Sequence, residues 1–140
     1  MASDTMKDLL NSAIARELSV SISYMWQHVI MESIDAGSVG TIMKKIAIIE
    51  MTHAEEIAER LVSLGGMPTT QPSEVQVGPP DAKEMLMINL GQEQNALKLY
   101  SEIIARAEKE NDPATRKLFE EILRDEEEHH STFTTLLGIL

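Results

Sequence analysis

The 140-residue sequence contains no cysteine, few aromatic residues and no long apolar run. Without cysteine the chain forms no disulfide, binds no iron–sulfur cluster or thiolate zinc, and has no cysteine nucleophile. Because aromatic residues make up only 4% of the chain, its core must be built from Leu, Ile, Ala and Met. No apolar stretch suits a membrane span, and the charges within MASDTMKDLLNSAIAREL do not fit a signal peptide. We therefore expect a cytoplasmic protein without a membrane partner.

Basic residues are also scarce relative to acidic ones. The chain has 12 Lys and Arg against 23 Asp and Glu, which gives a formal net charge of −11. This charge disfavours nucleic acid as a partner, because phosphates repel an acidic surface. Acidity either keeps the protein soluble or attracts cations. The length fits one domain, residues 1–140, with a core of its own.

The spacing of apolar residues predicts an all-α chain with four long helices and no strand. The segment TTQPSEVQVGPP between the second and third helices is punctuated by Pro and Gly and is too irregular to be helical. Capping signals at Asp81 and at Asp112–Pro113 start the last two helices. The expected spans are Asp4 to about Asp35, Ser38 to near residues 64–68, Asp81 to near residues 109–112, and Asp112 to about Gly138.

A glutamate lies on the apolar line near the middle of every predicted helix: Glu17, Glu50, Glu93 and Glu126. In the second and fourth helices a histidine follows three residues later on the same face, at His53 and His129. Glu50 follows Glu17 by 33 residues, and Glu126 follows Glu93 by the same interval, as if one helical hairpin were used twice. The apolar lines are also predicted to include His28, Leu90, Leu97 and Ile104.

The depth of these glutamates within their helices predicts the topology. Glu50 lies 12 residues after Ser38 and Glu93 lies 12 residues after Asp81, so they meet only if the second and third helices are parallel. Helices of this size are roughly 40 Å long, and the segment Gly65–Pro80 can span roughly 50 Å when extended. We therefore expect an up-down-down-up four-helix bundle with one long crossover.

Four glutamates and two histidines thus converge at one level of the predicted core. Buried carboxylates repel one another and cannot all ionise unaided, whereas divalent metal ions hold them deprotonated. One Glu from each of two helices plus Glu-x-x-His from each of the other two is a dinuclear metal pattern, and oxygen-rich ligation favours iron or manganese over zinc. A Glu-x-x-His motif is also common on solvated helix faces. A second register, Glu127 with His130, is rotated by about 100°, so Glu126 with His129 is preferred.

These motifs resemble those of the bacterioferritin family, within the ferritin-like superfamily, across nearly the whole chain. The matching segments are ARELSVSISY, EMTHAEEIAERLVSLGGMP and EILRDEEEHH. The resemblance implies a di-iron site with Glu50 and Glu126 as bridging ligands. The terminal ligands that it implies are Glu17 with His53 on one iron and Glu93 with His129 on the other.

Two further residues gain candidate roles from the resemblance. Tyr24 matches a tyrosine beside the family's site that hydrogen-bonds a ligand or passes an electron; the alternative is a core tyrosine with a satisfied hydroxyl. Met51 matches a methionine that ligates haem at a two-fold dimer interface; the alternative is interface packing. Met51 points away from Glu50, and the apolar outer faces of the first two helices are typical of a partner surface.

The sequence also departs from the family pattern. The chain stops at Leu140, and the short fifth helix that helps to close the family's twenty-four-subunit cage is not expected. The chain therefore resembles short, mini-bacterioferritin-like forms, and a dodecamer is favoured. The His and Asp of an inner iron position in some bacterioferritins are replaced by Lys45 and Ile49.

The leading interpretation is an iron-storage and detoxification ferroxidase that oxidises Fe(II) with O2 or H2O2 inside a homo-oligomeric shell. One alternative is a di-iron or di-manganese peroxidase or oxygenase that acts as a small oligomer without storage. The other is a haem-binding or shell-forming protein with a vestigial site, against which the complete set of six ligands argues.

Overall fold

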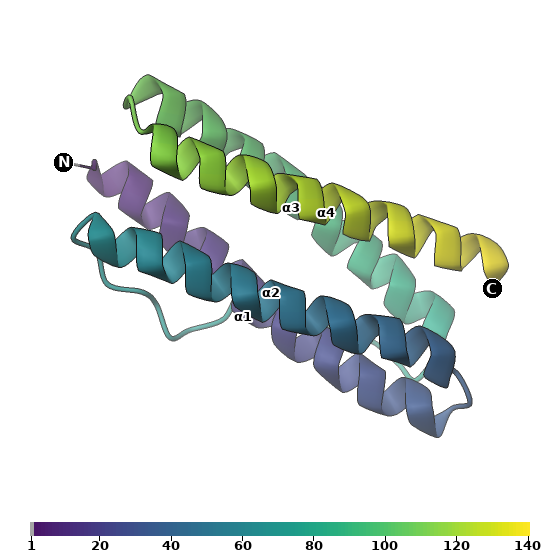
Figure 1. Cartoon of the computed structure of the whole chain (residues 1–140). Helices are drawn as coiled ribbons and strands as arrows, with labels where there is room; N and C mark the ends of the chain where they lie inside the picture. The colour runs from purple at the N-terminus through teal and green to yellow at the C-terminus, as the bar shows by residue number, and fades with distance from the viewer. Residues whose placement is uncertain (1) are drawn as a thin grey trace.

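A computed structural model describes residues 2–140 as a four-helix bundle (Figure 1). The helices are α1 (Asp4–Ser33), α2 (Gly37–Ser63), α3 (Ala82–Lys109) and α4 (Pro113–Ile139). The helix pairs α1–α2 and α3–α4 form two hairpins, and the long connection between α2 and α3 makes these two helices parallel. The predicted all-α, up-down-down-up fold is therefore confirmed. No helix in residues 2–140 combines the length and apolarity that a membrane span requires.

Local signals in the sequence explain where the helices begin and end. The side chains of Ser3, Asp81 and Asp112 each accept a hydrogen bond from a backbone N–H in the first turn of α1, α3 and α4, at 3.0, 3.1 and 3.0 Å. Gly65 after α2 has a φ of 87°, and the N–H of Gly66 bonds to the carbonyl of Leu61, which closes that helix in the left-handed conformation that glycine favours.

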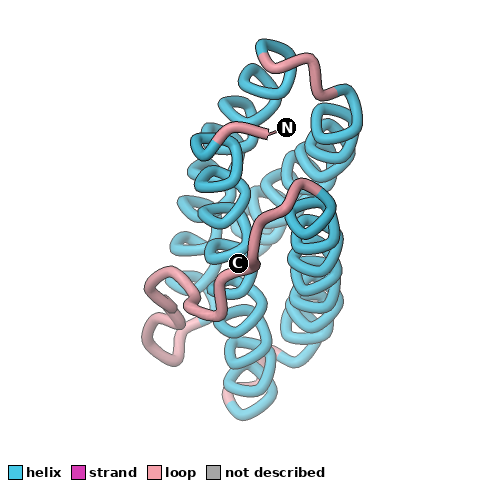
Figure 2. Tube along the Cα trace, turned by 90° about the vertical axis from the view of Figure 1, so that its left-hand side faces the viewer, coloured by secondary structure: helices cyan, strands magenta, loops and turns pink. Residues whose placement is uncertain are grey.

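The crossover between α2 and α3 is the longest connection of the chain and is one of the segments drawn as loop in Figure 2. Hydrogen bonds hold it along α1. The Ser73 N–H donates to the carbonyl of Ala15 at 3.0 Å, and the Ser19 hydroxyl donates to the carbonyl of Glu74 at 2.8 Å. Further along, the Gln27 amide donates to the carbonyl of Val77 at 2.9 Å. These bonds satisfy backbone groups that an irregular segment would otherwise leave unpaired.

Two apolar clusters form the core, and a polar layer separates them. One cluster surrounds Leu10, Ile57 and Phe119, and the other surrounds Met43, Leu86 and Phe133. The four mid-helix glutamates lie between these clusters, and all four are fully buried. The fold therefore places its most polar core residues at the middle of its height.

The predicted apolar lines are wrong in part. In α1 the buried residue is Gln27, and His28 is only half-buried. In α3 the buried line runs through Asn89, Ala96 and Ile103, whereas Leu90, Leu97 and Ile104 are half-buried. The Asn89 amide donates to the Gln27 side-chain oxygen at 2.7 Å and receives a bond in return, so both amides are satisfied in the core.

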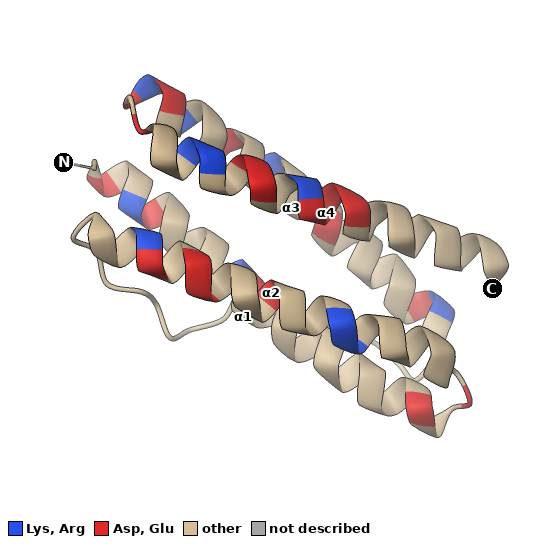
Figure 3. Ribbon diagram, in the orientation of Figure 1, with Lys and Arg blue, Asp and Glu red and all other residues tan. Residues whose placement is uncertain are grey.

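Charged residues are unevenly distributed along the helices (Figure 3). Asp and Glu outnumber Lys and Arg, and residues 131–140 at the end of α4 carry no charge of either sign.

Candidate metal centre

The six sequence-predicted ligands come together in the polar layer as two groups that share two members. One group is formed by Glu17, Glu50, His53 and Glu126, and the other by Glu50, Glu93, Glu126 and His129. In each group one nitrogen or oxygen of every residue lies within 4.8 Å of those of the others, and all the residues are buried. Glu50 and Glu126 belong to both groups. The geometry therefore matches two metal positions with two shared carboxylates.

Each histidine presents its Nδ1 atom to this cluster. Nδ1 of His53 lies 3.1 Å from Glu50, and Nδ1 of His129 lies 2.9 Å from Glu126. Nε2 of His53 lies 2.8 Å from the carboxylate of Asp125. A carboxylate partner at Nε2 fixes the tautomer that leaves Nδ1 free to bind a metal. Asp125, which precedes Glu126 in the sequence, is thus a supporting residue that sequence reasoning missed.

Arg16 is a second residue that sequence reasoning missed. Its side chain is only 8% exposed, and its Nη1 atom contacts Glu17 at 3.3 Å, Glu50 at 3.1 Å and Glu126 at shorter range. Its Nη2 atom lies 3.3 Å from Glu93. One guanidinium group therefore reaches all four buried carboxylates.

Two tyrosines flank the cluster in a symmetric arrangement. The Tyr24 hydroxyl on α1 donates to Glu93 on α3 at 2.9 Å, and the Tyr100 hydroxyl on α3 donates to Glu17 on α1 at 2.9 Å. Both side chains are fully buried. Tyr24 thus has a satisfied hydroxyl whose partner is a candidate ligand, and Tyr100 is its unpredicted counterpart.

The environment of the carboxylates disfavours their charged forms. Burial raises the pKa of Glu50 well above its ordinary value, and the neighbouring Glu126 raises it further. Burial, followed by the charge of Glu126, also raises the pKa of Glu17. Burial raises the pKa of Glu93 to about 7, although the Arg16 guanidinium opposes this shift. The cluster therefore holds more negative charge than its own cations balance.

The pKa values of Glu126 and of the two histidines are shifted for a different reason. Burial acts to raise the pKa of Glu126, but the Arg16 guanidinium outweighs it and lowers the pKa to about 2. Burial acts to lower the pKa of His53, but its glutamate neighbours raise it to about 12. The pKa of His129 is raised in the same manner by Glu126, against the effect of burial.

Several buried ligand atoms fit a metal better than they fit this hydrogen-bond network. Within residues 2–140, Oε1 of Glu50, Nδ1 of His53 and Oε2 of Glu93 are buried and make no well-directed hydrogen bond, although Nδ1 of His53 lies 3.1 Å from Oε1 of Glu50. Unsatisfied buried polar atoms are costly in an ordinary core. Carboxylate oxygens and imidazole nitrogens are also the donors that iron and manganese accept. The residues present therefore fit a pair of divalent ions.

The second register proposed for α4 lies outside the cluster. Glu127 is exposed and His130 is half-buried, and neither residue belongs to the two groups. Lys45 and Ile49 line a hollow of about 200 Å³ that reaches His129 and Asp125. This hollow lies between α2 and α4, and His129 is the candidate ligand among its lining residues.

Met51 points away from the carboxylates and is 47% exposed. It lines an almost wholly apolar groove of about 360 Å³ between the outer faces of α1 and α2. The other lining residues are Ser21, Ile22, Met25, Trp26, Ala47 and Ile48.

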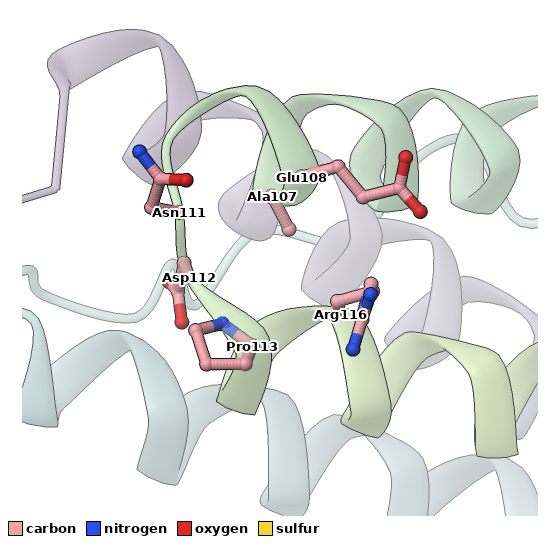
Figure 4. A pocket seen from close by; sticks show the side chains of 6 residues that line it. All are labelled: Ala107, Glu108, Asn111, Asp112, Pro113 and Arg116. Atoms are coloured by element: carbon pink, nitrogen blue, oxygen red, sulfur yellow. The ribbon is translucent and has the colours of Figure 1, made fainter.

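A larger hollow, of about 590 Å³, lies beside the turn between α3 and α4 (Figure 4). Glu108 of α3 and Arg116 of α4 line it, and Asn111 and Asp112 form the turn. The Asp112 carboxylate is already engaged by Arg60 at 2.8 Å and by the Thr115 backbone at 3.0 Å. This hollow is therefore a feature of the helix cap and contains none of the candidate metal ligands.

The raised pKa of Glu93 predicts how the stability of the metal-free protein depends on pH. Its pKa of about 7 in the folded protein exceeds the ordinary value of 4.5, so its stabilising contribution is present below pH 4.5 and is lost as the pH rises through 7. The raised pKa values of Glu17 and Glu50 act in the same direction. We expect metal-free protein to unfold at lower urea concentration at pH 8 than at pH 5.

Glu93→Gln is the matched variant for this urea experiment, because it removes the titrating group and keeps the shape of the side chain. The variant should show a smaller difference between the two pH values. If the metal-free parent were as stable at pH 8 as at pH 5, or more stable, the raised pKa of Glu93 would be contradicted.

A four-helix bundle with one long crossover and a buried layer of Glu and His defines the ferritin-like class of proteins. The chain belongs to this family, because the ferritin-like domain family matches residues 7–140. Among named relatives, it is similar to a bacterioferritin of Desulfovibrio desulfuricans, with 37% identity over 94% of this chain and 73% of that protein. It is also similar to the bacterioferritins of Rhodobacter capsulatus, at 31% identity over 94% and 82% of the two chains, and Brucella melitensis, at 29% over 94% and 81%.

Proposed function

We propose that the protein is a ferroxidase that stores and detoxifies iron. The observation that carries this proposal is the buried pair of groups that share Glu50 and Glu126. Glu17 with His53 would complete one Fe(II) position, and Glu93 with His129 the other. Fe(II) is the substrate, and two Fe(II) ions each give up one electron. These two electrons would reduce H2O2 to two water molecules, or O2 to H2O2, with the uptake of two protons in either case.

The chain's own residues would prepare the site for this chemistry. The two shared carboxylates, Glu50 and Glu126, would contribute ligands to both ions of a dinuclear site. The Asp125 carboxylate orients His53, and the hydroxyls of Tyr24 and Tyr100 orient Glu93 and Glu17. Tyr24 is in addition the residue that we propose to pass an electron. The surrounding apolar clusters limit access of water.

We propose that the Met51 groove binds haem, with one Met51 from each of two subunits as axial ligands. The groove is apolar, and methionine sulfur is an established axial ligand of haem iron. A bound haem supplies one-electron transfer. The partner surface would be the outer face of α1 and α2, where Trp26, Val29 and Ile48 are more than half exposed.

Haem reconstitution tests this role of Met51. We expect the parent protein to bind haem with a sharp Soret band, and Met51→Leu to lose the spectrum of the Met-ligated form. Met25→Leu is the matched control, since Met25 lines the same groove, and it should keep the parent spectrum. A Met51→Leu spectrum identical to the parent's would contradict the axial role.

The assembly that we propose is a cytoplasmic homo-oligomeric shell, with a dodecamer favoured over a twenty-four-subunit cage. The chain would form two-fold dimers through α1 and α2, and these dimers would build the shell. Iron retained as Fe(III) inside such a shell would separate storage from simple turnover of oxidant.

The proposed function is tested by adding Fe(II) anaerobically, then O2 or H2O2, and following Fe(III) by absorbance. Light scattering during size exclusion then shows whether the iron elutes with the protein and at what mass. We expect rapid oxidation and iron that co-elutes with a large assembly. A small dimer that consumes peroxide but retains no iron would instead establish the peroxidase or oxygenase alternative.

A further inference from the structure

Arg16 lies against the carboxylates of one candidate metal position. Its Nη1 atom contacts all three carboxylates of the group completed by His53, namely Glu17, Glu50 and Glu126. Nη1 contacts Oε2 of Glu17 and of Glu50, whereas Oε1 of both carboxylates faces Nδ1 of His53. A cation that bound this group would share the same carboxylates with the guanidinium, and the two positive charges would repel each other.

Arg16 contacts the second group through both of its terminal nitrogens. Nη1 meets the two shared carboxylates, Glu50 and Glu126, and Nη2 meets the separate carboxylate, Glu93, at 3.3 Å. Nη2 also donates to the backbone carbonyl of Gln92 at 3.3 Å. A single nitrogen therefore meets all three carboxylates of the group next to His53, whereas no single nitrogen does so in the second group.

Charge explains why such a cation is present. One guanidinium carries a single positive charge against four buried carboxylates, whereas two divalent ions would bring four. In a low-dielectric interior an unpaired carboxylate is costly. Arg16 offsets part of this cost without metal, but it adds repulsion once metal has arrived.

Arg16 also has an alternative environment close at hand. Its guanidinium carbon lies 5.9 Å from the centre of the Tyr100 ring, within the range of cation–π attraction. Gln92 is half-buried, and its backbone carbonyl accepts a hydrogen bond from Nη2 of Arg16. The Tyr100 ring and the Gln92 carbonyl are thus partners of the guanidinium other than the carboxylates.

We propose that Arg16 is a displaceable counter-cation that competes with divalent metal and makes the Glu17–His53 position the weaker of the two. This inference rests on the proposed dinuclear site. It assigns Arg16 a positioning role in setting metal affinity and the order of loading, and it does not make Arg16 a metal ligand.

The test is a Co(II) titration of the purified full chain, followed by visible absorption and calorimetry. We expect the parent to bind two ions in separate steps. Arg16→Gln should lower the dissociation constant of the weaker step by about tenfold or more. The substitution removes a buried positive charge that repels the ion, and this repulsion exceeds the free energy that corresponds to a tenfold change in affinity. The stronger step should change less.

Thermal unfolding gives a readout that a purely structural arginine would not produce. Without metal, Arg16→Gln should unfold at a lower temperature than the parent; with Co(II) it should equal or exceed the parent. Arg60→Gln is the matched control, because Arg60 pairs with Asp112 away from the cluster. It should lower stability equally in both conditions and leave Co(II) affinity unchanged.

The outcomes separate the two proposals. If the parent binds no Co(II) at the cluster, the proposed function fails. If the parent binds two ions and Arg16→Gln binds neither more tightly, only the counter-cation inference is overturned. An Arg16→Gln protein that folds only with metal supports the inference. If Arg16→Gln folds neither with nor without metal, the Arg16→Lys variant is titrated instead, because a single ammonium should compete less well than a guanidinium. A Co(II) affinity above that of the parent supports the inference. An affinity equal to or below that of the parent overturns it.

Discussion

Replacing Glu50 with glutamine is expected to abolish rapid oxidation of Fe(II). Glu50 belongs to both groups of candidate ligands, so one substitution removes a carboxylate from both metal positions. We expect the initial rate to fall by at least about 100-fold, since even residues that only support metal ligands account for 10- to 100-fold in affinity or activity. Stopped-flow absorbance of Fe(III) after mixing with O2 or H2O2 measures this rate.

The same substitution should stabilise the metal-free fold. Burial and the neighbouring Glu126 raise the pKa of Glu50 well above its ordinary value, which means that its charged form is unfavourable there. A neutral amide removes that repulsion. Glu55→Gln, at an exposed position on the same helix, is the control and should change neither rate nor stability. A Glu50→Gln protein that oxidises Fe(II) at the parent rate would refute the assigned site.

Metal loading is expected to raise the unfolding temperature of the parent by about 15 °C. An ion at 100 times its dissociation constant stabilises the fold by about 2.7 kcal/mol, so two ions contribute about 5 kcal/mol. For a chain of this size, each kcal/mol shifts the unfolding temperature by about 2–4 °C or slightly more. Differential scanning calorimetry with Co(II) and with excess chelator, at one protein concentration, measures the difference.

Two adjacent variants decide which register of α4 binds the metal. Glu126 is fully buried and belongs to both groups, whereas Glu127 is exposed. Glu126→Gln should lose most of the metal-dependent shift, and Glu127→Gln should keep it. The opposite result would place the metal in the Glu127–His130 register.

The sequence was sufficient for the fold and for the ligand cluster because two independent regularities agree. The 33-residue interval between Glu17 and Glu50 recurs between Glu93 and Glu126, and the length of the crossover permits parallel α2 and α3. Apolar periodicity places each glutamate on an inward line. Once the topology is fixed, these lines bring the six residues to one level.

The face of α3 that is buried was harder to predict, because both of the faces that could point inward contain apolar residues. Leu90 and Leu97 are larger than Asn89 and Ala96, so hydrophobicity favours the wrong line. The small Ala96 side chain permits close packing, and Asn89 is satisfied by Gln27 on α1. Pairing between distant helices is not visible in the pattern of either helix alone.

Arg16, Tyr100 and Asp125 were missed for different reasons. Arg16 is adjacent to Glu17, so its Cα lies about 100° off the inward line of α1, but its long side chain reaches the cluster. Asp125 is likewise adjacent to Glu126 and approaches His53 from the side. For Tyr100 a signal was available: a tyrosine follows the glutamate by seven residues in both α1 and α3, as Tyr24 and Tyr100.

The polar layer carries a cost that the rest of the fold offsets. Four carboxylates between two apolar clusters weaken the metal-free core, and buried ion networks are seldom the most stable solution for a core of the same volume. Retention of such a layer is the expected trade-off when a site needs charged ligands at fixed positions. Capped helices and the hydrogen-bonded crossover supply stability away from the site.

Anomalous X-ray diffraction at the iron edge, from crystals loaded with Fe(II) without oxygen, tests the dinuclear site most directly. We expect two anomalous peaks about 3.5–4 Å apart, both between Glu50 and Glu126, with one peak next to Nδ1 of His53 and the other next to Nδ1 of His129. A single peak, or peaks only at exposed acidic side chains with the cluster left empty, would contradict the dinuclear site.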